Sequence, residues 1–272
     1  PGVPYNFKEI QQAIKKGVKF SSATELFFKN AKGKIIGVTG TKGKGTTSTL
    51  IYRTLKNAGR DVYLAGNIGK PAIEILPRLT KKSITVLELS SFQLQGLKHS
   101  PHLAVVLDIF LDHMDAHQNF KEYFEAKSSI AKYQTFNEII FYNSDNKYSA
   151  LIAKQSRGKK IPVRAVPLRF HPKIPGAHNL KNIAMATAVA RYFNVPDKII
   201  IKTVNGFLGL PHRLRLVRTI GNIRFYNDSA STNPETAAAA IKAFPEIDKI
   251  VIMGGRDKNL NYAPLTKALK KE

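Results

Sequence analysis

Short apolar runs separated by longer amphipathic stretches set the pattern of most of this chain. Four of these runs are rich in β-branched residues and predict strands: Ile35–Thr39, Ile84–Leu89, Leu103–Asp108 and Ile139–Tyr142. Their continuous hydrophobicity is typical of strands covered on both faces, as in a parallel sheet. Helical patterns at Lys44–Ala58 and Phe120–Ala131 lie between them and indicate repeated strand–helix–strand units.

The two ends of the chain carry different patterns. Residues 1–33 predict a short helical lead-in, in which Ser22 and Glu25 have the spacing of a helix capping box. An alanine-rich helix is predicted at Ala177–Asn194, and the glycine- and proline-rich stretch Gly206–Pro211 suits a hinge. Beyond the hinge the pattern predicts a strand, a helix and a strand at Asn222–Asn227, Pro234–Phe244 and Lys249–Met253.

These patterns predict the fold class and the division of the chain. We expect a central P-loop-type α/β domain over residues 34–209, with a mostly parallel sheet flanked by helices. The start of a second, Rossmann-like α/β domain is expected over residues 210–272.

Charge raises a question about partners. The 272 residues include 43 Lys or Arg against 19 Asp or Glu, for a net charge of +24. This balance is typical of proteins that bind nucleic acid or membrane surfaces. The basic residues are spread along the sequence, however, and a basic background or an anionic substrate explains the same balance. We therefore expect no specific nucleic-acid partner.

Composition excludes other classes. The chain has no cysteine, so it forms neither disulfides nor cysteine metal sites. No apolar stretch approaches the roughly 20 residues that a membrane helix needs. We expect no membrane insertion and a cytoplasmic location.

A glycine-rich loop follows the first predicted strand and opens the first predicted helix. It runs from Gly40 through Thr41, Lys42, Gly43, Lys44 and Gly45 to Thr46. Glycines let backbone N–H groups surround phosphate oxygens, the helix N-terminus adds its positive end, and Lys44 can reach the β- and γ-phosphates. Gly45 replaces the hydroxyl residue that normally helps to hold Mg²⁺, and Thr46 is the candidate substitute.

Two charged residues fall in apolar surroundings. Glu88 lies inside the run Ile84–Leu89, where an unpaired carboxylate is costly, so Mg²⁺ is its natural partner unless the charge escapes at the strand end. Lys127 shares a predicted helix face with Phe120, Tyr123, Phe124 and Ile130. A lysine in such a place usually extends its ammonium to water.

The order of short motifs resembles the Mur ligase family. The phosphate loop is similar to the family's T-G-T-x-G-K-[ST]-T, and Leu87 to Leu94 is similar to the L-E-L-S-S-F-Q-L segment of the D-glutamate-adding member. Six further segments resemble family motifs in the family's order: Gly66-Asn67-Ile68-Gly69, Asp112-His113-Met114-Asp115, His178-Asn179-x-x-Asn182, Leu210-Pro211-His212-Arg213, Asn227-Asp228-Ser229 and Gly254-Gly255-x-x-Lys258. By the same comparison the chain is a fragment, with residues 1–33 as the tail of a UDP-binding domain.

The resemblance implies an ATP-dependent, Mg²⁺-requiring amide ligase of peptidoglycan synthesis. It implies that D-glutamate is joined to UDP-N-acetylmuramoyl-L-alanine through an acyl phosphate. It implies Lys44, Glu88, His113 and a carbamylated Lys127 as catalytic residues, the last three around the metal, where Thr46 is the candidate substitute for the hydroxyl missing at Gly45. The implied ATP contacts beyond the loop are Asn179, Asn182, Arg213 and Asp228, and the implied substrate contacts are Asn67, Ser90, Thr232 and Lys258.

Several alternatives stay open on the sequence alone. A loop His113 is usually a polar surface residue, and Asn179 suits a helix cap. Ala230 stands where the family often has Lys, and Arg215 where it has an acidic residue. A sister ligase with another amino acid or a folate substrate, and a basic nucleic-acid-binding NTPase, remain as other functions. A monomer is expected.

Overall fold

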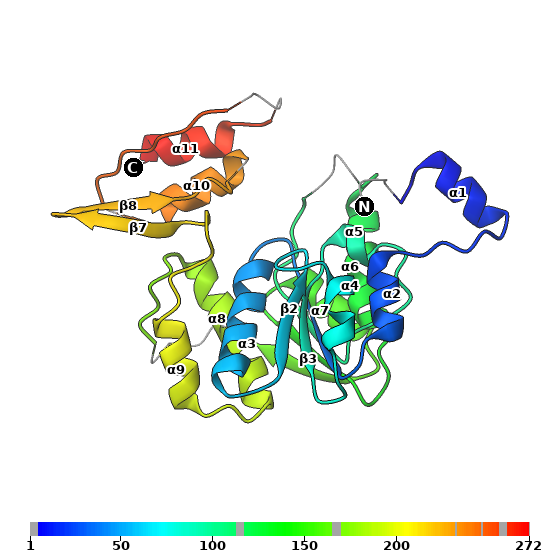
Figure 1. Cartoon of the computed structure of the whole chain (residues 1–272). Helices are drawn as coiled ribbons and strands as arrows, with labels where there is room; N and C mark the ends of the chain where they lie inside the picture. The colour runs from blue at the N-terminus through cyan, green and yellow to red at the C-terminus, as the bar shows by residue number, and fades with distance from the viewer. Residues whose placement is uncertain are drawn as a thin grey trace. The chain divides into compact units, whose positions relative to one another are not determined.

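The computed structural model describes residues 5–112, 117–164, 170–231, 233–245, 247–255 and 260–271. The chain divides into two compact units (Figure 1). The first unit combines Pro1–Pro167 with Lys181–Thr203, and the second combines Leu168–Leu180 with Val204–Glu272. Among the described helices, none is long and apolar enough to cross a bilayer.

The first unit is built on a six-stranded sheet with the order β2-β3-β1-β4-β5-β6. Its strands are β1 (Lys34–Thr39), β2 (Val62–Gly66), β3 (Ile84–Glu88), β4 (Leu103–Val106), β5 (Ile139–Asn143) and β6 (Lys159–Val163). Every pairing is parallel, which confirms the predicted sheet. The chain passes from β3 across β1 to β4, so the strand order reverses at β1, where parallel sheets bind ligands at the carboxyl ends.

Helices cover both faces of this sheet (Figure 1). They are α2 (Ala23–Asn30), α3 (Lys44–Asn57), α4 (Ala72–Ile75), the 3-10 turn η1 (Leu76–Arg78), α5 (Ser91–Leu94), α6 (Phe120–Lys132) and α7 (Lys147–Lys154). The first helix, α1 (Lys8–Lys15), stands apart from the sheet and buries no residue (Figure 1). Side chains of α2, α4, α6 and α7 form one core with alternate residues of the strands, such as Leu87 and Val106. Helix α3 buries Leu50, Ile51 and Leu55.

Local sequence explains where the helices of the lead-in and of the site begin. Ser22 caps α2, because its side chain accepts a hydrogen bond from the Glu25 amide. This is one half of the predicted capping box, since the Glu25 carboxylate pairs with Lys29 instead of bonding back to the Ser22 amide. Asn119 caps α6 in the same way, through the amide of Glu122. A left-handed Gly43, at φ 84°, turns the chain from the phosphate loop into α3.

Two helices pass from one unit to the other along the chain: α8 (Ala177–Tyr192) and α9 (Asp197–Asn205). The second unit then contains β7 (Arg215–Ile220), β8 (Ile223–Asn227), α10 (Pro234–Lys242) and α11 (Ala263–Lys271). β7 and β8 form an antiparallel hairpin, and α10 packs on α11 through Ala238, Ile241 and Ala268.

One predicted strand of the second unit is wrong. Lys249–Met253 forms no strand, although the predicted strand at Asn222–Asn227 and helix at Pro234–Phe244 are confirmed as β8 and α10. A strand needs a ladder partner, and the described part of the chain offers none here. Ile250 and Ile252 are each 96% exposed. The β-branched pattern is present, but the packing that a strand requires is not.

Candidate nucleotide and metal site

The phosphate loop lies at the carboxyl end of β1, where the strand order reverses. Its backbone is held by the two residues that follow β4, since Leu107 N donates to Thr39 O (2.9 Å) and Thr41 N donates to Asp108 O (2.8 Å). The Thr41 hydroxyl lies 2.9 Å from the Tyr123 hydroxyl and accepts from Phe110 N (2.9 Å). These bonds fix the loop before any phosphate is bound.

Two lysines converge on one carbonyl of this loop. Lys44 Nζ donates to Gly40 O (3.0 Å) and Thr41 O (3.1 Å), and Lys127 Nζ donates to the same Gly40 O (3.0 Å). Lys127 is only 1% exposed and lies 4.8 Å from the centre of the Tyr123 ring. The amino group of Lys127 does not reach water, unlike most lysines on an apolar helix face.

The surroundings change the pKa of Lys127. Burial, and next the cation of Lys44, lower this pKa well below its usual range, and the carboxylates of Asp112 and Glu88 raise it in part. The neutral amine is therefore more accessible at neutral pH than in an exposed lysine. A neutral amine is the form that reacts with CO₂.

Glu88 ends β3 beside the loop and is 6% exposed. Its carboxylate accepts from Asn67 Nδ2 (3.0 Å), and its carbonyl accepts from Asn67 N (2.9 Å). Gly66, at φ 103°, allows this approach, because a Cβ there would lie 2.3 Å from Glu88 O. The G-N-I-G turn thus holds the buried carboxylate in place.

Helix α5 begins next to Glu88. Ser90 caps it in a complete capping box with Gln93. Ser91 Oγ lies 2.9 Å from Nε2 of His117, whose ring stacks on Phe92 and meets Tyr123 edge-on. His117 and Tyr123 thus connect α5 with the phosphate loop. The sequence placed Tyr123 on the helix face of Lys127 without predicting its contact with the loop, and it gave no role to His117. The one available signal was the helical spacing of Tyr123 and Lys127.

Helix α8 carries the two predicted asparagines. Asn182 reaches the phosphate loop, since a Cβ on Gly43 would lie 2.2 Å from Asn182 Oδ1. Asn179 donates instead to Pro175 O (2.6 Å) at the start of the helix. Lys181 pairs with Asp108 at the end of β4 (3.1 Å), so an ion pair holds this helix beside the loop.

The turn that carries Arg213 belongs to the second unit. Its neighbours His212 and Leu214 have left-handed backbones, at φ 61° and 45°. Asp228 supports this turn, because its carboxylate accepts from Leu214 N (2.7 Å) and from Ser231 Oγ (2.5 Å). Arg213 itself is exposed. Four of the residues singled out from the sequence lie outside the described residues: His113, Asp115, Thr232 and Lys258.

The donors beside the loop suit Mg²⁺. The described residues contain no group of three or more His, Asp or Glu side chains that could enclose a metal. Mg²⁺ does not need one, because it binds one or two carboxylates together with water and phosphate oxygens. A buried Glu88 carboxylate with one amide partner fits this requirement.

Fold and loop together define a parallel α/β protein of the phosphate-loop class. Residues 38–171 match the Mur ligase middle domain. UDP-N-acetylmuramoylalanine–D-glutamate ligase of Symbiobacterium thermophilum is 34% identical over 97% of this chain, and that of Streptococcus mutans is 34% identical over 100%. The chain spans 64% and 65% of the lengths of these two relatives. The chain belongs to the Mur ligase family.

Solved structures share the fold. MurF from Acinetobacter baumannii superposes with a TM-score of 0.66 at 19% identity, over 83% of this chain and 57% of that one. Escherichia coli FolC in complex with DHPP and ADP gives 0.67 at 18% identity, over 92% of this chain and 75% of that one. At these identities the likeness extends to the fold alone.

Proposed function

We propose that this chain is part of an ATP-dependent ligase that joins D-glutamate to UDP-N-acetylmuramoyl-L-alanine in peptidoglycan precursor synthesis. The observation that supports this proposal best is the meeting of Lys44 and Lys127 at the Gly40 carbonyl, beside the buried Glu88. The curated relatives that match nearly the whole chain carry this activity in their names.

In the proposed reaction, the carboxylate of UDP-N-acetylmuramoyl-L-alanine takes the γ-phosphoryl group of ATP, and ADP leaves. The amine of D-glutamate then attacks the acyl phosphate, an amide forms and phosphate leaves. Lys44 would exchange its carbonyl partners for β- and γ-phosphate oxygens and neutralise their charge. When bound, Mg²⁺ would add further neutralisation, held by Glu88, His113, carbamylated Lys127 and Thr46.

The remaining roles follow the units of the chain. Residues 34–209 would bind ATP, with Asn182 and Asn179 at the nucleotide, and Asn67 and Ser90 would contact the muramoyl substrate. Residues 210–272 would supply Arg213 to the phosphates, Asp228 to the ribose, and Thr232 and Lys258 to D-glutamate. Residues 1–33 would join this part to a UDP-binding domain. We propose a monomer without a specific nucleic-acid partner.

Phosphate release by the purified protein tests this proposal. Release is expected only when ATP, Mg²⁺, UDP-N-acetylmuramoyl-L-alanine and D-glutamate are all present, and the product should carry one glutamyl residue by mass. A panel of L-glutamate, diamino acids and D-alanyl-D-alanine in place of D-glutamate, and of folate with L-glutamate in place of the muramoyl substrate, separates the sister ligases. Turnover with one of these replacements would move the chain to that sister activity. ATP hydrolysis that needs nucleic acid but no amino acid would support the NTPase alternative instead.

A further inference from the structure

The edge of the sheet opposite the phosphate loop gathers basic residues. In a parallel sheet all strands begin at the same edge, so the connections that precede them lie together. Exposed cations occur before or at the start of five of the six strands: Arg60 before β2, Lys81 and Lys82 before β3, Lys32 before β1, Lys98 before β4 and Arg157 before β6. We call this surface the basic edge.

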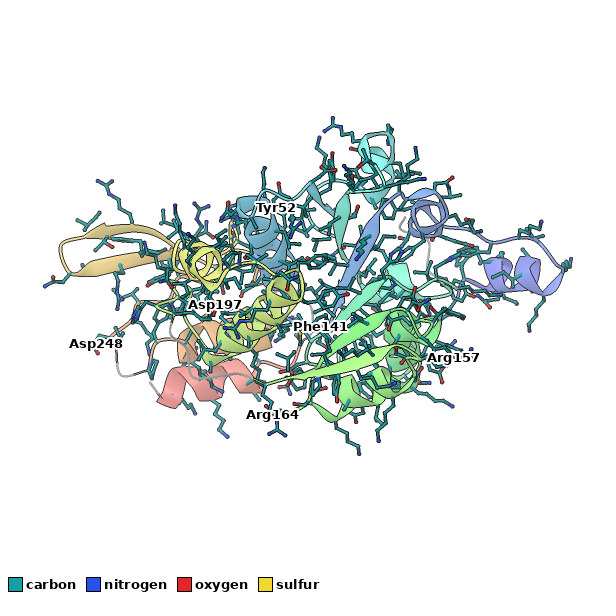
Figure 2. All side chains as sticks on the ribbon, turned by 90° about the horizontal axis from the view of Figure 1, so that it is seen from below. Tyr52, Phe141, Arg157, Arg164, Asp197 and Asp248 are labelled. Carbon is teal, nitrogen blue, oxygen red and sulfur yellow. The ribbon has the colours of Figure 1, made fainter. Side chains whose placement is uncertain are left out.

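Backbone hydrogen bonds make the basic edge continuous. Ile84 N donates to Asp61 O (2.8 Å) and Lys34 N donates to Ser83 O (2.9 Å). Farther along, Ile139 N donates to His102 O (3.0 Å) and Lys159 N donates to Glu138 O (2.9 Å). Strands lie about 4.8 Å apart, so six strands spread these cations over roughly 24 Å. Figure 2 views the molecule from below and labels Arg157 at its periphery.

Few carboxylates oppose this charge. Asp61 and Glu138 lie on the basic edge, and each accepts a hydrogen bond there, from the Ser83 hydroxyl and from Thr135 N. The carboxyl ends of the strands have a different balance. The cations there are accompanied by a larger share of carboxylates: Lys42, Lys44, Lys70, Lys121, Lys127, Lys147, Arg164 and Lys181 lie with Glu88, Asp108, Asp112, Glu122 and Asp145. Two of these carboxylates form ion pairs, Asp145 with Arg164 and Asp108 with Lys181. Carboxylates therefore offset more of the positive charge at the carboxyl ends than at the basic edge.

Residues 133–138, which precede β5, contain no Lys or Arg and instead expose an aromatic side chain at the basic edge. Phe136 is 81% exposed, and Tyr133 beside it is 40% exposed. A protruding phenylalanine among lysines is the composition of surfaces that bind anionic bilayers, where the ring enters the headgroup region. Most cations of the edge are lysines, which attract a diffuse anionic surface without the fork geometry that phosphate or base recognition favours.

We infer that the basic edge docks on an anionic lipid bilayer, with Phe136 as its apolar anchor. The carboxyl ends of the strands, with the phosphate loop, then face the aqueous side. This orientation follows from the parallel sheet, because its two edges are opposite ends of the same strands. Binding is peripheral, reversible and sensitive to salt.

Vesicle co-sedimentation tests this inference. The purified protein should bind phosphatidylglycerol vesicles at 0.1 M salt and dissociate from them at about 1 M salt, where screening is strong. It should not bind phosphatidylcholine vesicles. The double variant K81E/K82E should reduce partition at least roughly tenfold, since each basic residue near an anionic surface contributes substantially to binding. Phe136→Ser should weaken binding by a smaller factor.

A matched double variant distinguishes binding through the basic edge from attraction that depends only on the net charge of the protein. K121E/K147E makes the same charge change on exposed lysines in the first turns of α6 and α7, which begin near the carboxyl ends of the strands. It should bind nearly as the unmodified protein does. Equal losses in the two double variants, or no binding at all, would overturn the inference. Duplex DNA is then added as a competitor to protein bound on vesicles. Displacement at a DNA phosphate concentration below the lipid phosphate concentration would assign the basic edge to nucleic acid and would also overturn the inference.

Discussion

The amino group of Lys127 lies where water scarcely reaches. Its surroundings are the Gly40 carbonyl, the Tyr123 ring, the cation of Lys44 and two carboxylates. An ammonium here is poorly solvated and lies near a second cation, so the charged form is disfavoured. A carbamate on Lys127 would reverse the sign of the charge and complement Mg²⁺ and Lys44. One covalent change on one residue would therefore change the electrostatics of the whole loop.

Activity of Lys127 variants tests the carbamate. Lys127→Ala should lose most ligase activity while the fold is kept, because the anionic position is vacated. Acetate should restore part of that activity by filling the position. Lys127→Arg should stay inactive with or without acetate, since Arg retains its positive charge. Turnover would be measured with all three substrates saturating, and Lys132→Ala, on the exposed side of the same helix, is the control. Near-normal turnover of Lys127→Arg would contradict the carbamate.

Stability of a second Lys127 variant tests its lowered pKa. The unfolded chain keeps the ordinary lysine value of 10.5, and the folded value is lower. Between these two values the unfolded state binds more protons, so rising pH stabilises the folded protein. Lys127→Met should therefore stabilise the protein by about 1 kcal/mol at pH 7, the size of a typical stabilising substitution. This gain should shrink as pH approaches 10.5.

Urea unfolding in CO₂-free buffer between pH 7 and pH 10 measures this difference. Lys132→Met serves as the matched control, because Lys132 is exposed and should give no pH-dependent difference. A gain for Lys127→Met that stays constant over this range would show that the lysine is charged in the folded state throughout.

At the scale of elements, α3 combines a required glycine with an unusual one. Gly43 must stay glycine, because its backbone is left-handed and Asn182 occupies the space of a Cβ. Gly45 is the second residue of α3, where a glycine generally costs about 0.5–1 kcal/mol relative to alanine. At this position α3 therefore lacks both the stability that an alanine would add and the hydroxyl that usually helps to hold Mg²⁺.

Replacing Gly45 tests how the loop would hold Mg²⁺. Gly45→Ser should lower the Mg²⁺ concentration needed for half-maximal ligase activity severalfold, since it supplies the missing oxygen. Gly45→Ala should stabilise the protein without lowering that concentration, so it controls for the helix effect. Thr46→Ala should raise the requirement if Thr46 is the substitute, and G45S/T46A should restore it. An unchanged titration for Thr46→Ala would remove Thr46 from this role.

The sequence predicted the elements better than their packing. The strands β1, β3, β4 and β5 and the turn into α3 were predictable, because apolar runs and glycine spacing are local signals. β2, β6 and β7 were missed. Val62–Gly66 contains only one β-branched residue, β6 carries lysines and Pro162, and β7 carries Arg215 and Arg218. The strand predicted at Lys249–Met253 is absent because it lacks a partner. The contacts of His117 and Asp108 depend on tertiary approach, which no local pattern encodes.

At the scale of the whole molecule, burial is distributed unevenly between the two units. Every residue of β3 is buried, whereas every residue of β7 is exposed. Val217, Ile223 and Phe225 of the hairpin are 65%, 64% and 47% exposed. A two-stranded hairpin without a covered face is marginally stable in water. The second unit is therefore expected to open at a lower free energy than the first.

Hydrogen exchange measures this difference directly. Amides of β7 and β8 should exchange through openings that cost at least about 3 kcal/mol less than the openings of β1 and β3, because few apolar contacts hold them. Both sets of amides are followed in one sample by mass spectrometry, so that pH and temperature are shared. Equal protection of hairpin and sheet would mean that the two units unfold as one.

The same substitution at a buried and at an exposed valine compares the two units at single positions. Val86 in β3 is fully buried, and Val217 in β7 is 65% exposed. Val86→Thr should cost about 1–3 kcal/mol, since it buries a hydroxyl in an apolar core. Val217→Thr should stay within about 0.5 kcal/mol, as surface substitutions do. The substitution is identical in both, so a different result reflects burial alone. A cost for Val217→Thr equal to that for Val86→Thr would require that the hairpin bury this face in solution, against the exposure that the structure shows.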